Sequence, residues 1–97
     1  MATSTLDPKK LEEVASKLRA IAHPMRIAII DLLEKKEQMN VTDIYQTLSI
    51  EQASASHHLN ILKNKGVLDS RRSGKNTFYF LKHEALSQMI ECLNRCY

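Results

Sequence analysis

Residues 52–68, QASASHHLNILKNKGVL, carry the clearest structural pattern in the chain. At about 100° of rotation per residue in a helix, three of their apolar side chains fall on one narrow stripe. That stripe consists of Ala55, Leu59 and Leu62. Gly66 then supplies a residue that tolerates left-handed backbone angles and so ends a helix. The stretch therefore predicts an amphipathic helix over 52–64 that buries one side and exposes the other.

The exposed side of this predicted helix is polar, carries no acidic residue and is built from short side chains. Such a helix can lie deep in the DNA major groove, which is about 12 Å wide, with its N-terminal part on the base edges. We expect base contacts from Gln52, Ser54, Ser56, His57 and Asn60. His58 lies nearer the buried stripe, so a structural role is expected for it. A solvated polar face is the alternative, and the basic segment that follows favours the DNA-binding interpretation.

Before this helix, apolar residues recur at helical spacing in two longer segments and one short one. The long segments cover residues 8–22 and 24–33, and the short one covers 42–48. They predict three helices, with a short strand possible at 39–41.

The helix starts are also encoded locally. Asp7-Pro8 has an N-cap residue followed by a proline at the first helical position, and Pro24 opens the second helix. Thr42 is the expected cap of the short helix. Ser49 and Gln52 are spaced as a capping box for the helix over 52–64.

After Gly66 the period of apolar residues changes from 3.6 to 2. Residues 67–72 and 76–82 are typical of strands, and Ser73-Gly74-Lys75 between them indicates a β-hairpin. Helical spacing then returns in Leu86, Met89, Ile90 and Leu93. The order is α-α-α-α-β-β-α, which predicts a mainly helical winged helix-turn-helix in which residues 1–97 form one domain.

Positive charge is concentrated in the predicted helix over 52–64 and its hairpin. Residues 52–82 hold six basic residues and one acidic residue, whereas the rest of the chain carries a net charge of −2. A clustered basic surface is what a polyanion-binding protein presents. The residues expected to contact phosphates or the minor groove are Lys63, Arg71, Arg72 and Lys75.

Other classes of protein are disfavoured. No apolar run approaches the roughly 18 residues of a membrane span, and the first ten residues lack the apolar core of a secretion signal. A cytoplasmic location without a membrane partner is therefore expected. The chain has no glycine-rich phosphate loop and no paired carboxylates that can be placed in a pocket, so neither an enzyme nor a cofactor is expected.

Four segments together resemble the ArsR family of winged-helix repressors across nearly the whole chain. They are LRAIAHPMRIAIIDLL at 18–33, VTDIYQTL at 41–48, QASASHHLNILKNKGVL at 52–68 and RRSGKNTFYFL at 71–81. Two positions depart from the family pattern: Ala55 replaces the usual Val, and Glu51 stands where a Ser often caps the helix.

The resemblance implies a homodimer held by the first and last helices, with one recognition helix and one wing per subunit on the DNA. It also implies that the protein represses transcription from a palindromic operator. The alternative is a winged-helix module that binds only an acidic protein partner. The acid-free helix disfavours that alternative, because a protein-interaction module has no reason to avoid acidic residues there.

Many relatives release DNA when they bind a metal, and the resemblance implies where such sites would lie. One kind uses cysteines at the start of the third helix, where residues 38–43 have none. Another kind uses four ligands on the last helix and the partner's last helix. Here His83 falls near the first ligand position, but Ala85 stands at the second and the chain ends before the fourth. No metal site of either design is therefore expected.

Cys92 and Cys96 remain as candidates for sensing an effector that the sequence does not identify. They lie one helical turn apart and could share a soft metal or act as a redox pair across a dimer. The alternative is that both are small buried apolar residues in an interfacial helix, as free cysteines usually are.

Overall fold

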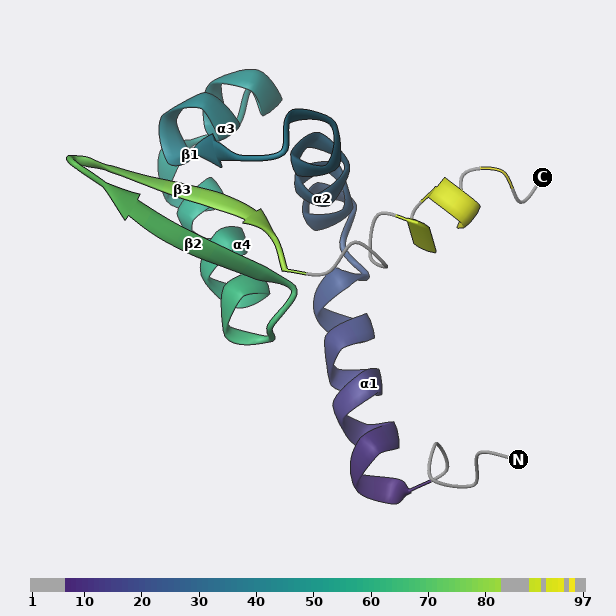
Figure 1. Ribbon diagram of the computed structural model, residues 1–97. Coiled ribbons are helices and arrows are strands. Elements are labelled where there is room, and N and C mark those ends of the chain that lie inside the picture. The colour runs from purple at the N-terminus through teal and green to yellow at the C-terminus, as the bar shows by residue number, and fades with distance from the viewer. Residues whose placement is uncertain (1–6, 83–87, 90, 94, 96–97) are drawn as a thin grey trace.

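The computed structural model describes residues 7–82, 88–89, 91–93 and 95. The described chain forms two helices, a short strand, two further helices and a hairpin of two strands, in that order (Figure 1). They are α1 (Pro8–Ile21), α2 (Pro24–Lys36), β1 (Met39–Asn40), α3 (Val41–Leu48), α4 (Gln52–Asn64), β2 (Leu68–Ser73) and β3 (Asn76–Leu81). The first four predicted helices, the hairpin and the short strand are confirmed, with small differences at their ends.

The three strands form one antiparallel sheet in the order β1-β3-β2. The β2–β3 hairpin runs in register from Leu68 opposite Leu81 to Ser73 opposite Asn76, which leaves a two-residue turn. Gly74 occupies the first turn position with φ +61°, as type II′ hairpin turns require. The sheet lies across α3 and α4, and the hairpin extends past them (Figure 1).

The core lies between α2, α3, α4 and the sheet. Its largest fully buried side chains are Ile29, Ile30, Leu33, Ile44, Leu59, Leu62, Val67 and Leu68. The predicted buried stripe of α4 is confirmed, because Ala55, Leu59 and Leu62 are each 0% exposed. The rotation of α4 about its axis is thereby fixed by packing.

Two of the predicted helix starts are confirmed. The Asp7 carboxylate accepts a hydrogen bond from the Lys9 amide at 3.2 Å, and Pro8 is the first helical residue of α1. At the start of α2 the cap is His23, whose Nδ1 accepts from the Met25 amide at 3.1 Å. Gly66 also behaves as expected, with φ +78° just after α4.

Two predicted caps are wrong. Asn40, not Thr42, caps α3, because its Oδ1 accepts from the Asp43 amide at 2.8 Å. Ser49 cannot form a capping box with Gln52, because it ends α3 in the left-handed conformation, with φ +56°. The turn between the helices is so short that Glu51 becomes the N-cap of α4, without a side-chain hydrogen bond.

The predicted last helix falls partly outside the described residues. Residues 88–89 and 91–93 are helical, and Arg95 pairs with Glu91 at 3.2 Å. Residues 83–87, 90, 94, 96 and 97 are not described, so the predictions for Leu86, Ile90 and Cys96 lie outside the structure. Within the described part of the chain, no helix is both long enough and apolar enough to cross a membrane.

The burial of α4 gives a direct stability test. Replacing Leu59 with Ala removes a side chain with no exposed surface and should lower the free energy of unfolding by about 2–5 kcal/mol. The adjacent Asn60→Ala substitution is the control, because Asn60 is exposed and should change stability by less than about 0.5 kcal/mol. Urea unfolding followed by circular dichroism measures both. Equal effects would mean that α4 does not bury this side.

Candidate nucleic-acid interface

Helices α3 and α4 form a helix-turn-helix with a very short turn. Ser49 in the left-handed conformation reverses the chain, and the Ile50 amide donates to the Tyr45 carbonyl at 3.1 Å. Ile44 of α3 and Leu59 of α4 share the same buried cluster. The second helix of the pair is therefore held rigidly against the first.

The side of α4 away from the core is open to solvent. Five of the residues predicted for DNA contact lie there with exposed side chains: Gln52, Ser54, His57, Asn60 and Lys63. Ser56 is half-buried at the margin of this face. The predicted residues of α4 thus lie on the solvent-exposed side of the helix or at its margins, and we call this set the α4 face (Gln52, Ser54, Ser56, His57, Asn60, Lys63).

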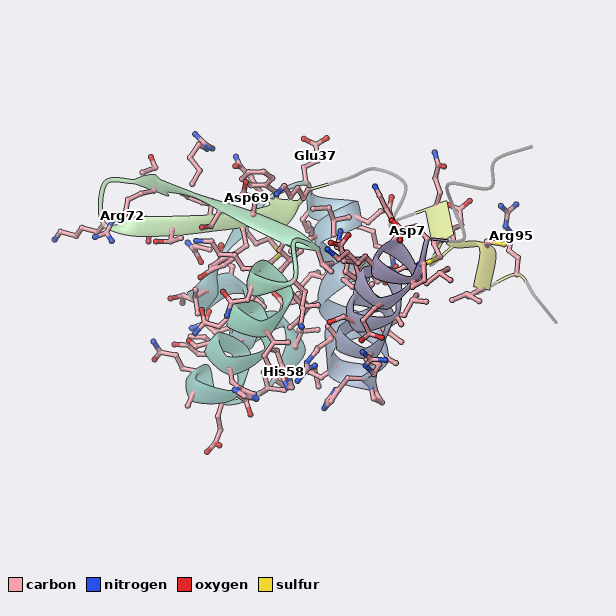
Figure 2. The ribbon with its side chains drawn as sticks, turned by 90° about the horizontal axis from the view of Figure 1, so that it is seen from below. Asp7, Glu37, His58, Asp69, Arg72 and Arg95 are labelled. Carbon is pink, nitrogen blue, oxygen red and sulfur yellow. The ribbon has the colours of Figure 1, made fainter. Side chains whose placement is uncertain are left out.

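The hairpin carries the remaining predicted contacts. Arg72 lies near its end and points away from the body of the molecule (Figure 2). Arg72 Nε donates to the Gly74 carbonyl at 3.4 Å, and Lys75 in the turn is exposed. Two cations therefore occupy the projecting end of the hairpin, next to residues small enough to approach a nucleic-acid backbone.

Arg71 is placed differently from Arg72. Successive side chains of a strand point to opposite faces, so these two arginines diverge. The Arg71 Nη2 donates to the Gln38 side-chain oxygen at 2.7 Å, which ties this guanidinium to the segment between α2 and β1. Arg71 would have to leave this partner in order to contact a phosphate.

Behind the α4 face, Arg26 of α2 joins three helices. Its Nε donates to His58 Nδ1 on α4 and its Nη1 donates to the Ala20 carbonyl on α1, each at 3.1 Å. The rings of His58 and His23 lie 4.7 Å apart between centroids, and those of His58 and His57 lie 5.7 Å apart. Figure 2 shows His58 in this position on α4. These contacts agree with the structural role predicted for His58, whereas no role is predicted from the sequence for Arg26 or His23.

The surroundings of His58 disfavour protonation of its imidazole ring. Burial of the ring lowers the pKa of His58 below its usual 6.5, and the positive charges of His23, Arg26 and His57 lower it further. In the sequence, His23 and Arg26 lie one helical turn apart at the start of α2, and this spacing indicates that their side chains are neighbours. Only the fold reveals that His58, 32 positions after Arg26, meets them.

The candidate sensing residues remain untested. Cys92 is exposed, while Cys96, His83 and Ala85 lie outside the described residues. Among the residues that the structure describes, no group of three or more His, Cys, Asp or Glu side chains is placed to hold a metal ion.

Comparisons with known proteins agree with this geometry. A family model described as bacterial regulatory protein, arsR family, matches residues 23–70. The transcriptional repressor PagR of Bacillus anthracis is 37% identical over 84 residues, which cover 87% of this chain and 84% of that protein. Its crystal structure superposes with a TM-score of 0.82 at 35% identity and covers 91% of this chain and 100% of the other.

Two further relatives extend the pattern. An uncharacterized HTH-type transcriptional regulator of Methanocaldococcus jannaschii is 33% identical over 86 residues, covering 89% of this chain and 97% of that protein. The HlyU structure from Vibrio cholerae superposes with a TM-score of 0.81 at 28% identity, covering 92% and 96% of the two chains. The fold is a winged helix-turn-helix, and the relatives are transcriptional regulators rather than enzymes. The chain therefore belongs to the ArsR family of bacterial regulatory proteins.

Proposed function

We propose that this protein is a homodimeric repressor that binds a two-fold symmetric operator in double-stranded DNA. The observation that carries the proposal is the α4 face, which is exposed, free of acidic residues and adjacent to the basic end of the hairpin. Packing of the opposite side of α4 fixes this face in one orientation. A rigid polar helix beside a projecting cationic hairpin suits a major groove and the phosphates next to it.

The N-terminal half of α4 would make the sequence-specific contacts. Gln52 can donate to and accept from adenine at the same time, and Ser54, Ser56 and His57 can hydrogen-bond to several base edges. Asn60 lies one turn after Ser56 and would extend the contact along the groove. No acidic side chain lies within the first turn of α4, and the one carboxylate at this end of the helix belongs to the N-cap residue, Glu51.

The phosphate contacts would come from the end of α4 and the hairpin. Lys63 is exposed in the last turn of α4, and Arg72 and Lys75 are exposed on the hairpin. Arg71 would contribute less, because its guanidinium is held by Gln38. These contacts set affinity and register more than sequence preference.

A second copy of the chain would cover α1. This helix extends from the body of the molecule (Figure 1), and Leu11, Val14 and Leu18 remain 48%, 53% and 47% exposed. Residues spaced in this way share one face of a helix. Leu93, in the C-terminal segment, is 59% exposed. Such apolar surface on a small domain favours a self-complementary interface, which would place two copies of α4 on one operator.

Selection of binding sites from a random duplex library tests the proposal. We expect the selected sequences to converge on an inverted repeat, with half-sites separated by about 10 base pairs or a multiple of that distance. Purified protein and deep sequencing of bound DNA measure this. Selection that yields no shared motif after several rounds would contradict the proposed function.

Substitutions should separate base contacts from phosphate contacts. His57→Ala should reduce the preference for the selected operator over random duplex, since a base contact contributes about 1–3 kcal/mol of discrimination. Arg72→Ala should instead weaken binding to both DNAs alike, with a larger effect than Arg71→Ala. Fluorescence anisotropy with labelled duplexes gives the two affinities for each variant.

Lys9→Ala is the matched control for this comparison, because it removes one positive charge from an exposed position on α1. It should leave binding within about twofold of the unaltered protein. If Lys9→Ala weakened binding as much as Arg72→Ala, net charge rather than the hairpin would explain the affinity.

The dimer interface can be tested independently of DNA. Val14→Glu places a charge in the exposed apolar stripe of α1 and should convert the dimer to a monomer in sedimentation equilibrium. Lys9→Glu makes an even larger change in charge but lies on another side of α1, so it should leave the dimer intact. A Val14→Glu protein that remained dimeric would exclude α1 as the interface.

A further inference from the structure

The contacts around Arg26 connect α1 to the α4 face. One guanidinium nitrogen of Arg26 holds the last turn of α1 through the Ala20 carbonyl, and another holds His58 on α4. His57, the neighbour of His58, belongs to the α4 face. A change in the Arg26–His58 hydrogen bond would therefore act directly on the helix that is proposed to enter the groove.

This hydrogen bond requires a neutral imidazole. Both nitrogens of an imidazolium carry hydrogens, so a protonated histidine has no acceptor for a guanidinium. His58 Nδ1 accepts from Arg26, and His23 Nδ1 accepts from the Met25 amide at the start of α2. Both rings must therefore carry their single hydrogen on Nε2 in the folded protein. A proton on either Nδ1 would break a hydrogen bond that holds α2 or α4.

The charged groups around His58 are all cationic. From the α2 side it faces His23 and Arg26, and from its own helix it faces His57. No carboxylate is among the groups that shift its titration. A proton gained by His58 would lie beside the Arg26 guanidinium, 3.1 Å from Nε, and would repel it.

We propose that Arg26 and His58 are positioning residues for DNA recognition, and that protonation of His58, within the His23–Arg26–His58 cluster, loosens α4 and weakens operator binding. The inference rests on the proposed function of the α4 face. Acidification would thus act on this protein as a signal for the release of DNA.

The lowered pKa of His58 gives the sign of the linked stability change. Between its folded-state pKa and 6.5, the unfolded chain binds more protons than the folded one. The stabilising contribution of His58 is therefore complete above about pH 6.5 and is lost as the pH falls through the folded-state value. The expected transition lies on the acid side of neutrality.

Acid also has a general effect on DNA binding, which opposes the proposed loss of operator affinity. Protonation of histidines adds positive charge, which ordinarily tightens binding to a polyanion such as DNA. The cluster is therefore tested by comparing the unaltered protein with a variant that keeps the hydrogen bonds but cannot titrate. Asparagine provides this variant, because its Oδ1 occupies nearly the place of Nδ1 and it is also a favourable N-cap residue.

The experiment measures the affinity of the selected operator at about pH 8 and about pH 5.5, at constant ionic strength. Each affinity is measured for the unaltered protein, for the His23→Asn/His58→Asn variant and for His58→Leu. At about pH 8 we expect the Asn variant to bind within about threefold of the unaltered protein, and His58→Leu to bind about tenfold more weakly. At about pH 5.5 the unaltered protein should lose about tenfold relative to the Asn variant.

An equal response of the unaltered protein and the Asn variant to acid would overturn the inference while leaving the proposed function intact. Absence of operator binding by the unaltered protein at about pH 8 would instead refute the proposed function.

A second measurement needs no substitution and covers the case in which the Asn variant fails to fold. If operator binding favours neutral His58, bound operator must lower the pKa of His58 further, by thermodynamic reciprocity. NMR titration of the imidazole Cε1–H signals, with and without operator DNA, measures this shift. A pKa of His58 that is unchanged or raised by the operator would contradict the inference.

Discussion

The burial of one side of α4 is the constraint on which the interface depends. Ala55, Leu59 and Leu62 have no exposed surface, and Leu59 and Leu62 belong to a cluster that also contains residues of α2, α3 and β2. A helix that is packed against the core along its length cannot rotate without opening cavities. Such cavities lower the free energy of unfolding by several kcal/mol, a large part of the total in a small domain. The polar side is consequently presented in one orientation, and this rigidity is what base recognition requires.

The same core also determines where the cations of the hairpin lie. Leu68 and Leu81 anchor the base of the hairpin in or against the core, while the end of the hairpin extends beyond the helices (Figure 1). Strand alternation from this anchored base gives Arg71 and Arg72 opposite directions. Arg71 is drawn toward Gln38, and Arg72 is left at the projecting end (Figure 2). The register of the hairpin thus places two neighbouring arginines in different environments.

Periodicity and turn residues were enough to predict the fold, because the apolar stripe of α4, the alternation in the hairpin and the two prolines are local features. The caps of α3 and α4 were mispredicted, because Thr42 and Ser49 have favourable cap chemistry, but the chain places Asn40 and Glu51 at the boundaries. The contacts of Arg26 with His58 and of Arg71 with Gln38 could not be predicted, since each joins residues more than 30 positions apart through packing.

The most direct test of DNA recognition by the α4 face and the hairpin is a salt series with two duplexes, one from upstream of the protein's own gene and one of random sequence. Three full phosphate contacts per subunit, from Lys63, Arg72 and Lys75, and a weaker one from Arg71 predict a slope of about −5 to −7 for log K against log salt concentration in the dimer. Tighter binding to the upstream duplex with this slope is the predicted result. Weak binding that depends on neither sequence nor salt would contradict DNA recognition by the α4 face and the hairpin. It would indicate that the winged-helix surface binds another partner.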